Sequence, residues 1–404
     1  MTTTLPILII GAGPVGLSLA LALARQGLPV ELFEAQPELS PEIRASTFHP
    51  PTLEMFAEWG VVENVLARGH KVDRLLYWER QSRELIAEFN YRHIAQDTPF
   101  PFRLQCPQSV LTRTLKPLVE ALPSARVHMN HRLVGFADCG DHVTAELETP
   151  NGRITVNGAY LCGADGAGST VRKGLDLGFT GMTYADRFLL IGTDLDLRPY
   201  FPAIGPVNYM YDPEEWVIIL HLADVVRVVF RLKPDEVEEE AMAETAVRQR
   251  IHNFIGQPVD FAIKSSSVYR VHQRVADTFR QGRVLLLGDA AHINNPAGGM
   301  GMNSGIHDAY HLARALATDL TGFEQSAIAN LSGLMDNPLD QYSQTRRQTA
   351  VAAIRAYSDK NYADLSARDP AYRQQRNAEL RATAADPAQA RAYLLRASMM
   401  PERI

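Results

Sequence analysis

The chain has 404 residues, of which 46 % are hydrophobic and 21 % are charged, and its net charge is −6. This length suits two or three domains with buried cores, which need no disulfides or structural metals for stability. Three cysteines without a CxxC pair exclude a disulfide framework, a cysteine-rich zinc site and a dithiol redox centre, and they favour a cytoplasmic protein. Because the sequence has no block of basic residues, no nucleic-acid partner is expected.

Residues 5–24 carry no charge, and a run of this length is compatible with a membrane span. Gly11, Gly13 and Gly16 interrupt the run, however. The first basic residue, Arg25, follows the run, whereas a signal sequence has basic residues before it. We therefore expect no membrane span and interpret the run as a strand, a glycine turn and a buried helix.

A βαβ unit is predicted at the start of the chain. Its strands cover residues 5–10 and 29–33, and its helix covers 15–24. The turn before the helix has the GxGxxG pattern from Gly11 to Gly16, which in this context indicates adenine-dinucleotide binding. The unit by itself does not distinguish FAD from NAD.

Each residue of this turn has a physical role. Gly11 allows the tight turn, Gly13 lets the backbone approach a pyrophosphate, and Gly16 lets the helix pack closely on the strand. The start of the helix, with Val15 in its first turn, directs free N–H groups at the pyrophosphate. Glu34, after the second strand, is expected to accept hydrogen bonds from ribose hydroxyls.

A second glycine-rich turn follows an apolar strand end near Tyr160. It contains Asp165 and Gly166 and leads into a helix that begins with the basic residues Arg172 and Lys173. This arrangement again places a turn and a helix start beside a buried strand.

Short β-rich runs separated by turn residues come next, and they predict an antiparallel sheet that covers the cofactor. The predicted strands are 188–197, 207–211, 216–222 and 226–232, followed by a charged helix over 236–254. Beyond residue 336 the chain is rich in Ala and Arg, and we expect surface helices there.

A third motif begins with a buried strand over 284–287, after which Asp289 is placed to accept hydrogen bonds from a polyol. A helix is predicted from Gly301, because apolar residues recur with helical spacing over 306–317. Its glycine-preceded N-terminus suits the negative charge of a reduced isoalloxazine. The expected cofactor contacts of this motif are Asp289, Gly299, Gly301, Met302 and Asn303.

These three motifs, in this order and spacing, resemble the single-component FAD-dependent aromatic monooxygenases of the para-hydroxybenzoate hydroxylase-like class. The resemblance covers residues 5–350 and implies an α/β fold with an α+β second domain. The expected FAD domain comprises 1–80, 106–180 and 276–335, the substrate-binding β-sheet domain 81–105 and 181–275, and the C-terminal helical region 336–404.

The resemblance also assigns cofactor contacts residue by residue. Arg44 is similar to the family's arginine near the FAD pyrophosphate, and Gln108 to its glutamine beside the ribityl chain. Asp165 is similar to a residue that serves both FAD and NAD(P)H, and Asp289 to the ribityl acceptor. Where the family often has arginine, this chain has Pro51.

The implied reaction hydroxylates a phenol or a hydroxylated N-heteroaromatic with NAD(P)H and O₂, through a flavin C4a-hydroperoxide. NAD(P)H would bind transiently, because no second nucleotide-binding fold is visible. The protein must exclude water, place the ring and remove a phenol proton. Candidate catalytic residues are His49, Tyr209, Tyr211 and the carbonyl of Pro296.

Weaker candidates are His292 beside the third motif and Arg227 and Arg231, which would bind a substrate carboxylate. The alternative function is a flavin reductase or dehydrogenase without oxygen insertion. We expect a small aromatic substrate, O₂ and NAD(P)H as partners, no bound metal, and a monomer or homodimer.

Overall fold

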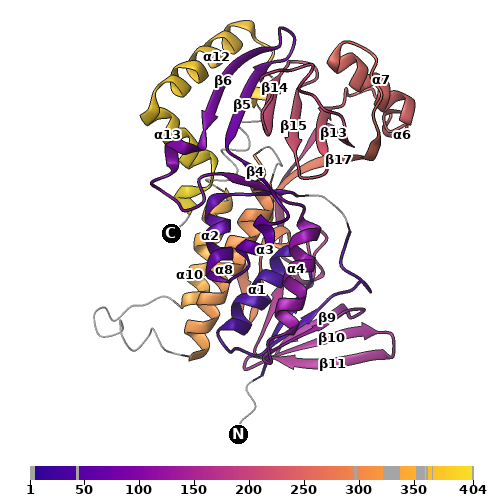
Figure 1. Cartoon of the computed structure of the whole chain (residues 1–404). Helices are drawn as coiled ribbons and strands as arrows, with labels where there is room; N and C mark the ends of the chain where they lie inside the picture. The colour runs from indigo at the N-terminus through magenta and orange to yellow at the C-terminus, as the bar shows by residue number, and fades with distance from the viewer. Residues whose placement is uncertain are drawn as a thin grey trace.

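The computed structural model describes residues 5–41, 45–294, 298–321, 337–351, 360, 363–365 and 367–402. Two large sheets organise the chain, one in each half of the molecule (Figure 1). Within the described residues, no helix is long and apolar enough to cross a bilayer.

The six-stranded sheet is parallel except at one edge, where β18 runs antiparallel to β19. Its order is β18 (Arg280–Gln281), β19 (Val284–Leu286), β12 (Tyr160–Gly163), β1 (Ile7–Ile10), β2 (Val30–Phe33) and β8 (Ala125–His128). All four residues of β1 are buried, as expected for a central parallel strand covered on both faces. The three segments that carry the glycine motifs therefore lie on adjacent strands.

Helices cover this sheet. They are α1 (Pro14–Arg25), α2 (Pro50–Glu58), α3 (Val62–Leu66), α4 (Gln108–Glu120), α5 (Thr170–Gly174), α8 (Gly301–Thr321) and α10 (Pro338–Thr349). Helix α1 packs between α8 and α4, and α10 packs on α8. Because α10 buries Leu339 and Tyr342, the expectation that all helices after residue 336 lie on the surface is wrong for this one.

The eight-stranded sheet is mostly antiparallel. Its order is β20 (His292–Ile293), β17 (Ile263–Ala276), β13 (Phe179–Thr193), β16 (Val226–Arg231), β15 (Val217–His221), β14 (Val207–Tyr211), β5 (Arg74–Glu79) and β6 (Glu84–Asn90). Strand β14 covers the predicted residues, whereas β13 begins before its predicted start because its polar first half pairs with β17. Strand β5, from the N-terminal segment, joins β14 in parallel.

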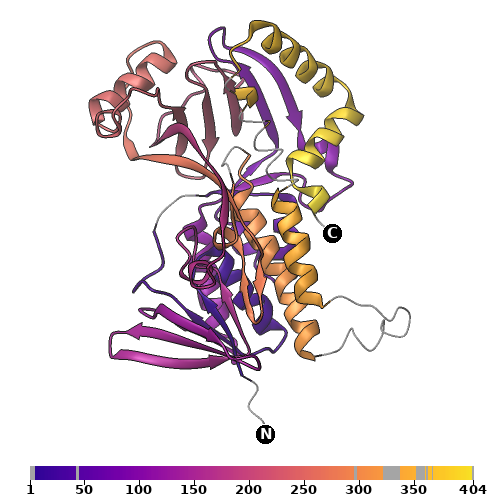
Figure 2. The same cartoon turned by 180° about the vertical axis from the view of Figure 1, so that it is seen from behind.

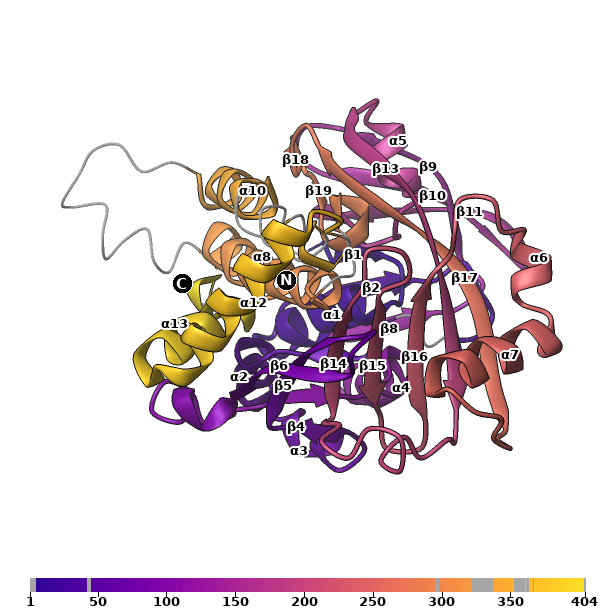
Figure 3. The same cartoon turned by 90° about the horizontal axis from the view of Figure 1, so that it is seen from above.

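Helices lie at opposite ends of this sheet (Figure 3). At one end are α6 (Glu238–Ala241) and α7 (Glu244–Ile255), where a single helix was predicted. At the other end are α12 (Pro370–Ala385) and α13 (Pro387–Ala397). The buried side chains of the sheet form two clusters, one on each face, because successive residues of a strand point to opposite faces; α7 packs on one cluster and α13 on the other.

Two small sheets complete the fold. One contains β3 (Thr47–Phe48), β7 (Arg103–Gln105) and β4 (His70–Val72). The other contains β9 (Arg132–Asp138), β10 (Val143–Thr149) and β11 (Gly152–Gly158) and projects from the lower half (Figure 2). Short 3₁₀ turns are η1 (Tyr91–Ile94), η2 (Gly288–Ala290) and η4 (Met400–Glu402).

Candidate active site

The three glycine motifs meet at the carboxyl ends of β1, β12 and β19. Gly11 lies so close to the second motif that a Cβ there would be 2.5 Å from the carbonyl oxygen of Ala164. Val15 contacts the third motif, because a Cβ on Gly305 would be 2.6 Å from its side chain. The fold thus assembles one site from segments separated by more than a hundred residues.

Other glycines of the motifs border open space instead of protein. A Cβ at Gly13, Gly166 or Gly301 would meet no atom within 4 Å. Beside Gly13 lies a pocket of about 120 Å³, adjacent to a second of about 310 Å³ that Arg113 and Lys116 line. The first pocket is lined by Ala12, Gly13, Pro14, Glu34, Gln108 and Thr112, among others. Bare backbone around open space at the start of α1 fits the pyrophosphate and adenosine of FAD.

Glu34 fixes the turn as well as lining this pocket. Its carboxylate accepts hydrogen bonds from the backbone N–H of Ala12 at 2.8 Å and of Gln36 at 2.9 Å. Each carboxylate oxygen keeps further acceptor capacity, which fits the expected ribose contact.

Asp165 has a local role in the second motif. Its carboxylate accepts hydrogen bonds from the Ser169 hydroxyl at 2.6 Å and from the backbone N–H groups of Thr170 and Val171. It therefore caps the start of α5, while Gly166 supplies the left-handed turn with φ +76°. The expectation that Asp165 contacts FAD and NAD(P)H stays a prediction.

A buried charge network packs against the backbone turn of the third motif. Asp308 on α8 accepts hydrogen bonds from the backbone N–H of Gly288 at 3.0 Å and from Arg346 Nε at 2.7 Å, and it lies 2.8 Å from His292 Nε2. Asp289 itself is exposed beside these buried groups. His292 thus belongs to the support of the turn, which argues against a catalytic role.

The charge state of this network follows from its surroundings. Burial by itself would raise the pKa of the Asp308 carboxyl, but the charges and hydrogen bonds of His292 and Arg346 hold that pKa well below its usual range. Asp308 is therefore an anion inside the protein.

Asn303 connects the third motif to the segment of β3 and the start of α2. Its Oδ1 accepts hydrogen bonds from the His49 N–H and the Thr52 hydroxyl, and its Nδ2 donates to the carbonyls of Thr47 and Gly299. All four hydrogen bonds of the amide are used. The side chain of Asn303 therefore positions the turn, and its expected contact with the cofactor, which would use the backbone N–H at the start of α8, stays a prediction.

His49 is fully buried at the start of α2. Its Nε2 donates a hydrogen bond to the carbonyl of Gly298 at 3.0 Å, which leaves Nδ1 as an acceptor without a partner. Burial and then the charge of Arg103 hold the pKa of His49 well below its ordinary value, against the raising effect of the Gly298 carbonyl. His49 is therefore neutral, and its Nδ1 can accept a hydrogen bond from a ligand.

Arg103 shares the face of His49. In the β3–β7 pair Thr47 is opposite Gln105 and Phe48 is opposite Leu104, so the continued register places His49 opposite Arg103. Arg103 donates to the Tyr209 hydroxyl of the eight-stranded sheet at 3.4 Å. From that sheet Arg227, whose pKa burial lowers to about 10, donates to the Ser46 hydroxyl at 3.3 Å. Two buried arginines thus join the sheet to the β3–β7 pair.

Tyr209 and Tyr211 do share one face, as their spacing predicts. Tyr209 stacks on Tyr77 with ring centroids 5.2 Å apart and contacts Arg103. The Tyr211 ring, by contrast, lies 3.8 Å below the guanidinium of Arg376 from α12. Tyr209 is therefore the better placed of the two for the site.

The remaining candidates divide into two groups. Arg44 and Pro296 lie outside the described residues. Arg231 is paired with Asp186 at 2.6 Å, which accounts for its charge within the sheet. Sequence reasoning missed Arg103 and Asp308, because neither belongs to a glycine motif and only the packing gives them partners.

Comparisons with known proteins find relatives that match most of the length of this chain. The FAD binding domain family matches residues 4–357. The chain is 31 % identical over 98 % of its length, and 96 % of the relative's, to a para-nitrophenol 4-monooxygenase of Pseudomonas sp. (strain WBC-3). It is 29 % identical, over 90 % of each chain, to the 6-hydroxy-3-succinoylpyridine 3-monooxygenase HspB of Pseudomonas putida (strain DSM 28022 / S16).

Solved structures agree. A p-nitrophenol 4-monooxygenase, PnpA from Pseudomonas putida DLL-E4, superposes with a TM-score of 0.89 at 30 % identity, over 100 % of this chain and 98 % of that one. Aklavinone-11 hydroxylase in complex with FAD and aklavinone superposes with a TM-score of 0.75 at 28 % identity, over 90 % of this chain and 70 % of that one.

The fold and the glycine site define an FAD-dependent flavoprotein of mixed α/β architecture. More specifically, the chain belongs to the FAD binding domain family and is a single-component FAD-dependent aromatic monooxygenase of the para-hydroxybenzoate hydroxylase-like class. The comparisons support hydroxylation and give no support to the reductase alternative.

Proposed function

We propose that the enzyme hydroxylates a small phenol or hydroxylated N-heteroaromatic, with NAD(P)H and O₂ as co-substrates. The observation that carries this proposal is the buried His49–Arg103 face between the FAD motifs and the eight-stranded sheet. The names of its relatives, a para-nitrophenol and a hydroxypyridine monooxygenase, support the same substrate class.

In this proposal His49 and Arg103 act on the substrate hydroxyl. His49 Nδ1 accepts the hydrogen bond of that hydroxyl, which increases the electron density of the ring. The positive charge of Arg103 lowers the pKa of a nearby phenol and so favours the phenolate. Both effects make the ring a better nucleophile toward an electrophilic oxygen.

The sheet covers the ring and excludes water. Tyr209 is 6 % exposed and stands on the face that α13 and the FAD half cover. Exclusion of water matters because water in the site promotes loss of the activated oxygen as hydrogen peroxide before it reaches the ring. FAD, when bound, would accept two electrons from NAD(P)H and, once reduced, would activate O₂.

His49→Ala tests the role of the buried acceptor. We expect the variant to retain FAD and to oxidise NAD(P)H in the presence of para-nitrophenol, while hydroxylated product falls about 10²-fold and peroxide rises. Product, peroxide and NAD(P)H are measured together, for Tyr209→Phe and Tyr211→Phe as well. Wild-type coupling in His49→Ala and Tyr209→Phe from pH 6 to 9 would exclude both as groups that activate the ring.

The substrate class has a separate test. A panel of phenols, benzoates and hydroxypyridines is scored for stimulated NAD(P)H oxidation and for incorporation of ¹⁸O from ¹⁸O₂ into product. Turnover of NAD(P)H with no labelled product from any member would favour the reductase instead.

We also propose a cytoplasmic location, which the free cysteines Cys106, Cys139 and Cys162 support. For the assembly we propose a monomer or a homodimer.

A further inference from the structure

Helix α13, near the C-terminal end of the chain, lies on the face of the eight-stranded sheet that carries Tyr209. Helix α13 ends at Ala397, whose carbonyl accepts a hydrogen bond from Arg103 Nη2 at 2.7 Å. The next residue, Ser398, is fully buried and hydrogen-bonds to the Tyr91 hydroxyl at 3.1 Å. The same arginine that contacts Tyr209 therefore also holds the end of α13.

Met399 is held in an unusual conformation. Its φ is +58°, in the left-handed region that residues with a side chain rarely adopt. Its side chain is 1 % exposed and packs against Met300, which is 2 % exposed, in a cluster separate from the main cores. Strain of this kind persists where the surroundings determine the conformation, and it is common at ligand sites.

Met300 connects this pair to His49. It follows Gly298, whose carbonyl accepts the His49 hydrogen bond, and Gly299, whose carbonyl accepts from Asn303. The Met300–Met399 pair thus lies beside the turn that His49 holds, at the edge of the predicted flavin site. Methionine is flexible and polarisable, and its sulfur makes favourable contacts with aromatic rings.

We propose that Met399, with Met300, forms an apolar wall of the substrate site and limits the size of the aromatic ring that the enzyme accepts. This proposal rests on the proposed function, because the ligand is the phenol or hydroxypyridine of that reaction. Arg103 keeps the wall in place through Ala397. The specificity of the enzyme then depends on a residue near the end of the chain, far in sequence from every cofactor motif.

The test compares Met399→Ala with Met399→Leu and with a buried control. Met399→Leu keeps the volume of the side chain and should keep the wild-type preference. Met210→Ala removes an equally buried methionine, 1 % exposed, from the opposite face of β14, in the cluster beneath α7. Met399→Gly is a second truncation whose backbone suits the left-handed conformation, which guards against loss of folding.

Each variant is measured as the FAD-loaded enzyme with 4-nitrophenol and with 4-nitrophenols that carry methyl, ethyl or isopropyl groups next to the hydroxyl. We expect Met399→Ala and Met399→Gly to raise kcat/KM for the larger rings relative to 4-nitrophenol by about tenfold or more, the scale of discrimination by an apolar pocket. Met399→Leu and Met210→Ala should leave this ratio unchanged. An unchanged ratio in both truncations, or an equal change in Met210→Ala, would overturn the proposal.

A binding measurement separates this proposal from the proposed function. Dissociation constants for the same phenols are obtained from the change in the flavin absorption spectrum on binding. If the enzyme binds the phenols with the expected size dependence but hydroxylates none, the proposed function fails and the wall is supported. If wild-type enzyme shows no binding of any phenol, both fail.

Discussion

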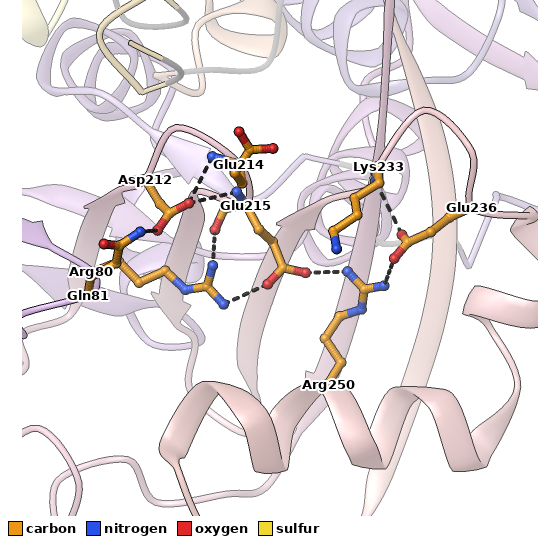
Figure 4. A network of polar contacts seen from close by, with 8 residues as sticks. All are labelled: Arg80, Gln81, Asp212, Glu214, Glu215, Lys233, Glu236 and Arg250. Atoms are coloured by element: carbon orange, nitrogen blue, oxygen red, sulfur yellow. Dashed lines mark hydrogen bonds and ion pairs between the residues drawn. The ribbon is translucent and has the colours of Figure 1, made fainter. Parts of the chain in front are cut away.

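Two charge networks, one in each half of the molecule, differ in what surrounds them. Around Asp308 the side chains of Asp308, His292 and Arg346 are 0 %, 1 % and 3 % exposed. At the outer end of the eight-stranded sheet, Arg80, Glu215, Arg250 and Glu236 form a chain of ion pairs that is 13 to 26 % exposed (Figure 4).

The two networks also stabilise different parts of the fold. Asp308 binds the backbone N–H of Gly288, directly before the residue expected to hold the ribityl chain. Glu215 joins Arg80, beside the β5–β6 turn, to Arg250 of α7, and so ties together the periphery of the sheet. A buried charge without its partner is costly, whereas a partly hydrated one is not. The buried network should therefore dominate both stability and cofactor geometry.

The largest effect is expected from Asp308→Ala. Loss of the carboxylate removes the ion pair between Asp308 and the buried charge of Arg346, so the apparent free energy of unfolding should fall by about 3–5 kcal/mol. Urea unfolding of the FAD-loaded enzyme measures this loss. A change below 1 kcal/mol would show that Arg346 is stabilised without Asp308.

The pH dependence of the same carboxylate is a second readout, with Asp308→Asn as the comparison. Because the folded pKa of Asp308 lies below its unfolded value of about 4, its contribution is complete above pH 4 and is lost as the pH falls through the folded pKa. Between pH 5 and pH 3 the wild type should therefore lose stability more steeply than Asp308→Asn.

An intermediate effect is expected on cofactor binding from Glu34→Ala. The variant loses the expected ribose contact and the hydrogen bond to Ala12 that shapes the turn, so FAD binding should weaken by about 1–3 kcal/mol. Fluorescence titration of apoenzyme with FAD gives the dissociation constant. Glu215→Ala is the control in the other half and should bind FAD like the wild type; an unchanged constant in Glu34→Ala would remove the ribose assignment.

The smallest effect is expected from Glu215→Gln. Its carboxylate lies 2.6 Å from Arg80 and also pairs with Arg250, but the group is 18 % exposed, so stability should fall by only about 1 kcal/mol. Raising the salt concentration to 1 M should reduce this difference, because partly hydrated charges are screened. A loss as large as that of Asp308→Ala would show that burial does not distinguish the two networks.

The sequence alone determined the cofactor half of this protein to a large extent. Glycine turns depend on local backbone geometry, and the structure has φ +106° at Gly11, +59° at Gly288 and +70° at Gly299. The buried strands and the helix from Gly301 follow from apolar runs and helical periodicity, which are also local in the chain.

Only the tertiary structure decided which side chains gather at the proposed substrate site. His49 and Arg103 come together through the pairing of two short strands, and Met399 contacts Met300 although about a hundred residues separate them in the chain. No periodicity marks such residues, because their partners are distant in sequence and the contact depends on how complete elements pack. The same reason explains Asp308, an acid on a helix that no motif marks, because only the packing brings Gly288, His292 and Arg346 around its carboxylate.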